Sequence, residues 1–322
     1  MGLQTQHGKR ETHLSFTLKI LGSSSATPAH GRFPTSQLLQ VEQHHFLIDC
    51  GEGTQFQLLR YHCKFNRINH ILISHLHGDH FYGLVGLLAT MNLSGRTNDL
   101  NLYGPPDLLE IITTQFRCSD TRLEYKITFH PLDPCTGVIL EDEQLTVSTI
   151  PLHHGIACTG FLFREKPRKR RINADALPGG VAAHQIKRLK EGKDIHDEHG
   201  NLLHANAQLT LPPRPSFSYA YCSDTAYFEP VIEQVTGVDL LYHEATFLTS
   251  EAARAAHTRH STAHQAATVA RLAGVKQLLI GHFSARYREL TPLLDEARDV
   301  FANTELAVEG LTVSLSNSVR KP

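Results

Sequence analysis

The sequence lacks the long apolar run that a membrane-spanning helix requires. Its first residues, MGLQTQHGKRETHLSF, also lack the apolar core of a secretory signal peptide. These two absences predict a protein that stays in the cytoplasm and has no membrane partner.

Cysteine is sparse and scattered. The chain has six cysteines and no Cys-x-x-Cys pair, which excludes a zinc ribbon and a thioredoxin-like redox site. Buried, reduced thiols are the expectation for such a pattern in a cytoplasmic protein.

An excess of charge of either sign is also missing. Lys and Arg number 31 against 32 Asp and Glu, so the formal net charge is -1. This balance excludes a protein that is basic all over, but it allows a local basic patch that binds nucleic acid. With 41% hydrophobic and 20% charged residues among 322, the chain is expected to fold around a sizeable core.

Short apolar runs rich in β-branched residues alternate with segments of helical periodicity. The predicted strands are 15–22, 36–42, 45–48, 70–74, 100–103, 126–130, 144–152, 160–163, 218–222, 239–243, 277–280 and 311–315. The predicted helices are 81–91, 107–116, 263–273 and 292–301. Two strand-rich stretches of similar weight predict an α/β protein, a single domain over residues 1–322, with two sheets and helices outside them. Residues 165–215 are polar, basic and weakly periodic, and they predict an inserted, projecting arm.

What stands out is 22 histidines, and some of them fall at metal-ligand spacing. His75-x-His77-x-Asp79-His80 directly follows the predicted strand 70–74. In an extended chain His75 and His77 point the same way, and a turn at Gly78 lets the next two ligands face a second point nearby. Nitrogen and carboxylate ligands together favour zinc over magnesium, so one short loop is predicted to serve two adjacent zinc ions.

Four side chains cannot complete two zinc sites, and the missing ligands are expected at other strand ends on the same sheet edge. The candidates that follow predicted strands are His153 or His154, Asp224 and His282.

Beyond this segment, the sequence resembles the metallo-β-lactamase superfamily and, within it, the ribonuclease Z family of tRNA 3′-processing endonucleases. The resemblance runs from about residue 17 to about residue 287. The matching pieces are LIDCGEGTQ at 47–55, SHLHGDH at 74–80, HGI at 154–156, SDT at 223–225, HEAT at 243–246, HST at 260–262 and HFSARY at 282–287. The HEAT and HST pieces separate this family from general hydrolases of the same fold.

The resemblance implies an αββα sandwich with an inserted arm, and two zinc ions per chain. One zinc ion would take His75, His77, His154 and Asp224, and the other would take Asp79, His80, Asp224 and His282. The family places its third histidine directly before Gly-Ile, which selects His154 over His153. Asp49 matches the family's first motif and would support the site from behind the ligands.

The implied reaction is hydroxide attack on the phosphodiester that joins a 3′ trailer to precursor tRNA, leaving a 3′-hydroxyl on the tRNA. Asp79 would orient the hydroxide or accept its proton. His260, held by Glu244, would protonate the departing 3′-oxygen. Arg286 and Ser284 would contact the substrate near the cut.

The substrate would also meet two basic segments. The arm begins with the run KPRKRR at 166–171, in which Lys169 and Arg170 would contact tRNA phosphates. The loop around Arg32 lies beside the RNA 3′ end in the family, so Arg32 is expected to bind substrate. Members of the family are commonly homodimers, and the same is expected here.

Two other functions compete with this interpretation. A small-molecule hydrolase of the same fold, such as a β-lactamase or phosphodiesterase, could use the same metal centre. A nucleic-acid-binding protein with a dead active site would have lost ligands, and none is missing here.

Overall fold

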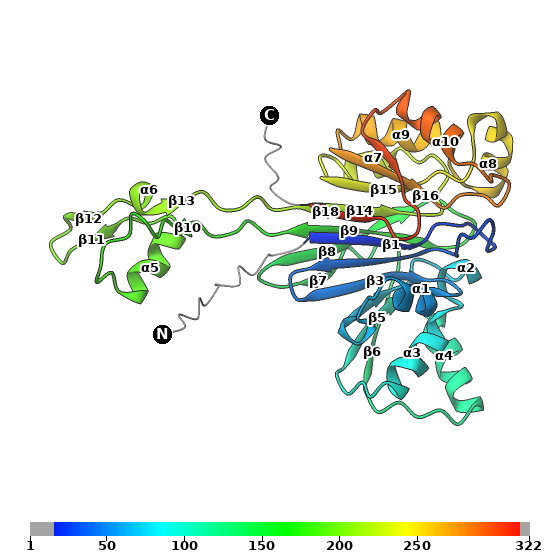
Figure 1. The fold of residues 1–322 in the computed structure, drawn as a ribbon, viewed down its shortest axis with the longest axis horizontal. Helices are drawn as coiled ribbons and strands as arrows, with labels where there is room; N and C mark the ends of the chain where they lie inside the picture. The colour runs from blue at the N-terminus through cyan, green and yellow to red at the C-terminus, as the bar shows by residue number, and fades with distance from the viewer. Residues whose placement is uncertain (1–15, 316–322) are drawn as a thin grey trace, which may run out of the picture.

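Two seven-stranded β-sheets lie face to face in the computed structural model, which describes residues 16–315. Helices cover the outer face of each sheet, so the predicted sandwich of two sheets between helices is confirmed (Figure 1). The N-terminal residues in which no signal peptide was expected, and residue 15 of the first predicted strand, lie outside the described range.

The first sheet has the strand order β18-β1-β2-β3-β4-β5-β6. Its strands are β1 (Phe16–Gly22), β2 (Ser36–Val41), β3 (His44–Cys50), β4 (His70–Leu72), β5 (Leu100–Gly104), β6 (Ile127–Pro131) and β18 (Thr312–Leu315). Its helices are α1 (Thr54–Arg60), the 3₁₀ turn Phe65–Arg67, α2 (Gly78–Phe81), α3 (Leu84–Leu93) and α4 (Asp107–Cys118). From β3 to β6 all neighbouring strands are parallel.

The second sheet has the order β17-β16-β15-β14-β9-β8-β7. Its strands are β7 (Val138–Glu141), β8 (Leu145–Leu152), β9 (Cys158–Glu165), β14 (Ser218–Cys222), β15 (Leu240–Glu244), β16 (Gln277–Gly281) and β17 (Thr304–Leu306). Its helices are α7 (Pro230–Gln234), the 3₁₀ turn Thr249–Glu251, α8 (Ala252–Thr258), α9 (Ala263–Leu272) and α10 (Thr291–Arg298). Strands β14 to β17 are parallel to one another, while β9 runs antiparallel to both β14 and β8.

Apolar side chains fill three layers. The layer between the sheets is aromatic-rich and includes Phe46, Phe161, Tyr219 and Tyr242. A second layer joins the first sheet to α3 and α4, and a third joins the second sheet to α7, α9 and α10. Because both faces of each sheet are covered, most central strands read as continuous apolar runs in the sequence.

The predicted helix over residues 81–91 is confirmed from Leu84 onward as α3, but its start is wrong, because Phe81 ends α2 and a turn at residues 82–83 separates the two helices. Gly83 lies at the break, and its backbone N–H donates to the Cys50 carbonyl at 2.9 Å. A Cβ atom at Gly83 would lie 2.2 Å from the Gly51 carbonyl oxygen. This close approach of two backbones, which the helical periodicity of the sequence does not reveal, ends one helix and starts the next.

The segment between β9 and β14 leaves the body as an arm (Figure 1). It contains β10 (Arg171–Ile172), α5 (Ala183–Lys190), β11 (Ile195–His196), β12 (Leu202–His204), α6 (Asn206–Leu209) and β13 (Thr210–Leu211). Leu189, Ile195 and Leu209 form a small buried cluster of their own. The arm is therefore a folded unit, which the weak periodicity of its sequence did not predict.

No helix within residues 16–315 is both long enough and apolar enough to cross a membrane.

Candidate metal centre and active site

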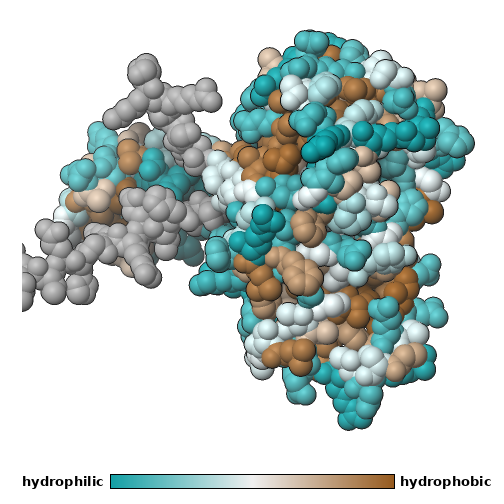
Figure 2. Space-filling view, turned by 45° about the vertical axis from the view of Figure 1, so that its right-hand side comes forward, coloured by the Kyte–Doolittle hydropathy of each residue, from teal (hydrophilic) through white to brown (hydrophobic). Residues whose placement is uncertain are grey.

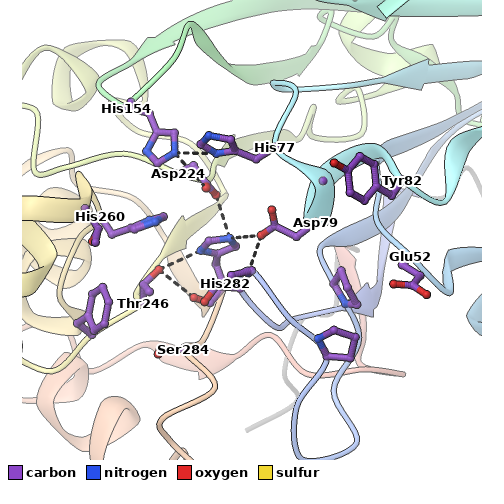
Figure 3. A pocket seen from close by; sticks show the side chains of 18 residues that line it. Glu52, His77, Asp79, Tyr82, His154, Asp224, Thr246, His260, His282 and Ser284 are labelled. Atoms are coloured by element: carbon purple, nitrogen blue, oxygen red, sulfur yellow. Dashed lines mark hydrogen bonds and ion pairs between the residues drawn. The ribbon is translucent and has the colours of Figure 1, made fainter. Parts of the chain in front are cut away.

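A pocket of about 580 Å³ opens where β4, β8, β14 and β16 all end. Its lining includes His77, Asp79, His154, Asp224, His260 and His282 (Figure 3). The expectation of one shared sheet edge is wrong, because β4 belongs to the first sheet and β8, β14 and β16 belong to the second. Loops at neighbouring edges of both sheets bring residues far apart in the sequence to one point.

The segment Ser74–His80 supplies ligands in two directions. After β4 the chain is extended, and His75 Nε2 lies 3.0 Å from His77 Nδ1. Helix α2 then begins at Gly78 and turns Asp79 and His80 toward a second point. A Cβ atom at Gly78 would lie 2.2 Å from the ring of Tyr82, so the exposed Tyr82 side chain would have to move to admit a larger residue at this turn.

Later strand ends complete two groups of ligand atoms. One group consists of His75, His77, His154 and Asp224, and the other contains Asp79, His80 and His282; the atoms of each group lie within 4.8 Å of one another. His260 lies within the same distance of Asp224 and His282. His153, the alternative to His154, is in neither group.

Asp224 lies between the two groups and offers one oxygen to each. Its Oδ2 lies 3.5 Å from His75 Nε2 and 3.6 Å from His154 Nε2. Its Oδ1 lies 3.1 Å from Nε2 of both His80 and His282. A bridging carboxylate between two cations requires this arrangement.

The donor set fits zinc by distance and by chemistry. Ligand atoms on a tetrahedral zinc ion lie about 3.3 Å apart when each Zn–N bond is about 2.0 Å, and the separations given above range from 3.0 to 3.6 Å. In residues 16–315, the Nε2 atoms of His80 and His282 are buried without a hydrogen-bond partner. A buried ring nitrogen without a partner is costly unless its lone pair binds a cation.

The ligands are held in strained or fixed orientations. Asp224 and His282 both have left-handed backbone torsions, with φ of 55° and 59°. Such torsions cost free energy in residues other than glycine and cluster at functional sites. His154 is oriented by the Arg259 carbonyl oxygen, 3.0 Å from its Nδ1, which leaves Nε2 facing the other ligands.

Asp49 lies behind the ligands and is fully buried. Its Oδ2 lies 2.7 Å from His80 Nδ1 and accepts from the Tyr221 hydroxyl at 2.5 Å, while Oδ1 accepts from the Ser74 backbone N–H. A carboxylate in this place orients the imidazole and increases its basicity as a ligand.

His260 and Glu244 form a pair next to the ligands. Glu244 is fully buried, and its Oε1 lies 2.7 Å from His260 Nδ1. Burial lowers the pKa of His260, but the charge and hydrogen bond of Glu244 outweigh it and raise the pKa to about 9. The raised pKa favours the protonated form of His260, whose other ring nitrogen faces the pocket (Figure 3).

The side chains expected to bind substrate lie in different surroundings. Ser284 lines the pocket, and Arg286 is exposed on the same loop. Lys169 and Arg170 lie on the arm, where Lys169 is exposed and Arg170 Nε donates to Thr210 Oγ1 at 2.7 Å.

Arg32 differs from its expected role as a substrate ligand. It is only 8% exposed, and its guanidinium donates to the Tyr287 carbonyl at 2.7 Å and to the Ser284 carbonyl at 3.4 Å. With its Nη2 directed at two backbone carbonyls, Arg32 supports the loop that carries Ser284 and Arg286 instead of facing a phosphate.

Several contacts of the site carry no recognisable motif. The Ala26 backbone N–H donates to Asp79 Oδ2 at 2.7 Å, and Tyr82 and Phe247 line the pocket. Thr246 contacts both Glu244 and His282; it belongs to the HEAT piece but had no predicted role. Among these residues, only Thr246 could have been predicted from the sequence, because it belongs to the HEAT piece.

Comparison with known proteins gives consistent matches along the chain. Residues 16–172 match the family profile described as Anti-Pycsar protein Apyc1, and residues 182–283 match the one described as Beta-lactamase superfamily domain. A protein named ribonuclease Z from Bacteroides fragilis (strain YCH46) is 49% identical over 302 residues, which cover 93% of this chain and 99% of the relative. A ribonuclease Z from Cytophaga hutchinsonii is 48% identical over 307 residues, covering 95% and 98%.

A solved structure is also similar over its full length. The human tRNase Z short form has a TM-score of 0.66 and 27% identity, covering 93% of this chain and 99% of that chain.

Proposed function

Because the chain belongs to the ribonuclease Z family, whose members are tRNA 3′-processing endoribonucleases, we propose that it removes 3′ trailers from precursor tRNA with two zinc ions. The observation that supports the zinc centre best is the position of Asp224 between two groups of ligands: its Oδ2 faces one group and its Oδ1 faces the other. One zinc ion would be held by His75, His77, His154 and Asp224, and the other by Asp79, His80, Asp224 and His282.

When bound, two zinc ions supply Lewis-acid charge and lower the pKa of a water molecule toward neutrality. Asp79 is the side chain placed to orient that water, because the Ala26 N–H holds its Oδ2 beside His282 Nε2, 3.4 Å away. Its second carboxylate oxygen remains to accept a proton.

The leaving group of the reaction is a ribose 3′-oxygen, which needs a proton as the P–O bond breaks. The raised pKa of His260 favours its protonated form, and the side chain lines the same pocket as the ligands, so its Nε2 would donate this proton. Glu244 keeps the charged form of His260 stable and fixes its orientation through Nδ1. Asp49 would serve the metal site by holding His80.

Substrate binding would be divided between the pocket and the arm. Ser284 and Arg286 lie on the loop at the pocket and would contact the phosphates next to the cut. Lys169 and Arg170 belong to the basic start of the arm, residues 165–215, which would bind tRNA phosphates away from the cut. Arg32 would act on the substrate indirectly, by holding the Ser284–Tyr287 loop.

We further propose that two copies associate through the outer face of α1 and α3. The two helices are tied by a hydrogen bond from Thr90 to Gln55 at 2.8 Å, and they expose Phe56, Leu59 and Leu93 at 64%, 55% and 87%. Figure 2 shows hydrophobic areas on the lower half of the body, the half that carries these helices in Figure 1. Exposed apolar side chains that gather on one face typically mark a contact surface.

Replacing Phe56 and Leu59 together by Glu tests this dimer. We expect the wild-type protein to sediment as a dimer and the double variant to sediment as a monomer, because charges on both copies would be buried at the interface. A monomeric wild-type protein would contradict the proposal.

We also propose that the enzyme acts in the cytoplasm, because its proposed substrate is precursor tRNA. All six cysteines are free thiols, and free thiols persist in the reducing cytoplasm.

The activity itself is tested with the zinc-loaded protein and a precursor tRNA that carries a 3′ trailer. We expect one cut that leaves a 3′-hydroxyl on the tRNA, and about two zinc ions per chain by elemental analysis. An intact precursor together with rapid hydrolysis of a β-lactam would replace this proposal with that of a small-molecule hydrolase.

A further inference from the structure

Each sheet carries one buried carboxylate beside the ligand cluster. Asp49 lies near the end of β3 in the first sheet, and Glu244 ends β15 in the second. Both are 0% exposed, and each contacts one imidazole directly: Asp49 reaches His80 Nδ1 at 2.7 Å, and Glu244 reaches His260 Nδ1 at 2.7 Å.

Each carboxylate also reaches a second imidazole through a hydroxyl group. In the second sheet Thr246 Oγ1 lies 2.6 Å from Glu244 Oε2 and 2.9 Å from His282 Nδ1. In the first sheet Ser74 Oγ lies 2.9 Å from Asp49 Oδ2 and 3.0 Å from His75 Nδ1, and the longer distance of 3.4 Å separates it from His80 Nδ1, which Asp49 already contacts directly.

Proton counting assigns the direction of these hydrogen bonds. A hydroxyl has one proton, and an ionised carboxylate is the stronger acceptor, so Thr246 donates to Glu244 rather than to the His282 carbonyl oxygen, which lies 2.9 Å away. The same hydroxyl must then accept from His282 Nδ1, which has to carry the proton. His282 Nε2 keeps its lone pair and faces Asp224 Oδ1 at 3.1 Å.

The same reasoning applies to His75. If Ser74 donates to Asp49, its oxygen accepts from His75 Nδ1–H, and Nε2 is left for a metal ion. Cys158 Sγ lies 3.6 Å from the same Nδ1 and donates to the Ser223 carbonyl at 3.5 Å, so the sulfur is also placed as an acceptor. Both neighbours of His75 Nδ1 therefore favour the tautomer that binds metal through Nε2.

We propose that Thr246 and Ser74 are positioning residues, each of which relays a buried carboxylate to one histidine ligand and fixes that ligand's tautomer. This inference rests on the proposed metal centre. Thr246 serves the metal site of His282, and Ser74 serves the site of His75. Glu244 contacts the proton donor His260 directly and the ligand His282 through Thr246, so it connects the donor to one metal site. Asp49 contacts His80 directly and His75 through Ser74, so it connects the two metal sites to each other.

Removing one hydroxyl should therefore weaken one metal site and leave the other intact. Thr246→Val preserves the shape of the side chain, and we expect it to weaken one of two zinc-binding steps by about 10- to 100-fold in a chelator competition titration. Ser74→Ala should weaken the other step. Thr246→Ser keeps the hydroxyl and should bind both ions as the wild type does.

Two buried hydroxyls that contact no imidazole provide matched controls. Thr304 Oγ1 donates to the Phe301 carbonyl at 2.5 Å, and Ser218 Oγ donates to the Asp239 carboxylate at 2.8 Å. Thr304→Val and Ser218→Ala should leave both zinc-binding steps unchanged. Equal weakening by a control and its partner variant would mean that a general structural disturbance is responsible, and it would overturn the inference.

A second readout does not depend on any variant. In zinc-loaded wild-type protein with ¹⁵N-labelled histidine, long-range ¹⁵N–¹H spectra should show protons on Nδ1 of His282 and His75. A proton on Nε2 of either residue in the metal-free protein, or wild-type zinc affinities in Thr246→Val, would overturn the inference alone. A wild-type protein that binds no zinc would overturn the metal centre and this inference together.

Discussion

At the scale of single residues, the buried carboxylate Glu244 and the imidazole of His260 determine each other's charge. Glu244 accepts hydrogen bonds from the backbone N–H groups of Thr225 and Ser261 in addition to His260. Burial raises the pKa of Glu244, but the charge and hydrogen bond of His260, together with the charge of His282, lower it below its usual value. Donor and carboxylate therefore stabilise each other as an ion pair in a place where neither could be charged alone.

Replacing His260 by Ala removes the proposed proton donor without touching the proposed ligands. We expect kcat for precursor tRNA cleavage to fall by about 10² to 10⁴, the usual contribution of a general acid. Zinc content, measured by elemental analysis on the same sample, should stay at the wild-type level. A parallel loss of zinc and activity would assign His260 to the metal site instead.

Replacing Glu244 by Gln changes the pH dependence of the reaction. His260 must be protonated to donate, so activity is present below its pKa and is lost as the pH rises through it, with a limit of about 9. Without the carboxylate the pKa falls toward the ordinary histidine value of about 6.5.

The alkaline limb of kcat/KM for Glu244→Gln, recorded at saturating zinc, should therefore move to lower pH. Bound metal ions disfavour the charged imidazolium, so they move the alkaline limb to lower pH in the wild type and in Glu244→Gln alike. The limb of the variant should still lie at lower pH than that of the wild type. An unchanged limb would exclude His260 as the titrating donor.

At the scale of elements, the break between α2 and α3 places two ligands. Helix α2 carries Asp79 and His80, and its end is held against the loop after β3 by the approach of Gly83 to Gly51. The periodicity of residues 81–91 predicted α3 but started it three residues too early, because the backbone contact between Gly83 and Gly51 leaves no trace in the apolar pattern.

Gly83→Ala should consequently damage both stability and metal binding. Its Cβ would lie 2.2 Å from the Gly51 carbonyl oxygen, and overpacking of this kind costs about 1 to 3 kcal/mol. Urea unfolding and zinc titration measure the two effects.

Gly86 in α3 is the matched control, because its Cβ would meet only the Gln55 side chain, at 3.9 Å. Gly86→Ala should be neutral or stabilising by about 0.5 to 1 kcal/mol, since alanine favours the helix. Equal destabilisation by both substitutions would mean that helix composition, and not the contact with Gly51, determines the effect.

At the scale of the whole molecule, the arm and the pocket are separate parts of one chain. The arm has its own apolar cluster, and it joins the body where Arg164 in β9 pairs with Ser218 in β14. Because these are antiparallel neighbours, a short hairpin turn can replace the arm without changing either strand.

A variant in which a short glycine-containing turn replaces residues 168–214 should keep its zinc and still hydrolyse bis(p-nitrophenyl) phosphate. Its KM for precursor tRNA should rise by about tenfold or more, and the dependence of binding on salt should become shallower, because fewer phosphates are neutralised. Kinetics at several salt concentrations would measure both. Unchanged tRNA kinetics would remove the arm from substrate binding.

Residues close together in the sequence determined the clearest part of the prediction. Ser74–His80 predicts a metal site because a strand, a glycine turn and a short helix fix the directions of its ligands locally. The order of later strand ends also indicated Asp224, His282 and one of the pair His153 and His154, and the family resemblance selected His154. The helix break at Gly83, the burial of Arg32 and the hydroxyl contacts of Thr246 and Ser74 were decided only by the tertiary structure. Each depends on which backbone or side chain from a distant segment packs against that residue, and neither composition nor periodicity encodes such a contact.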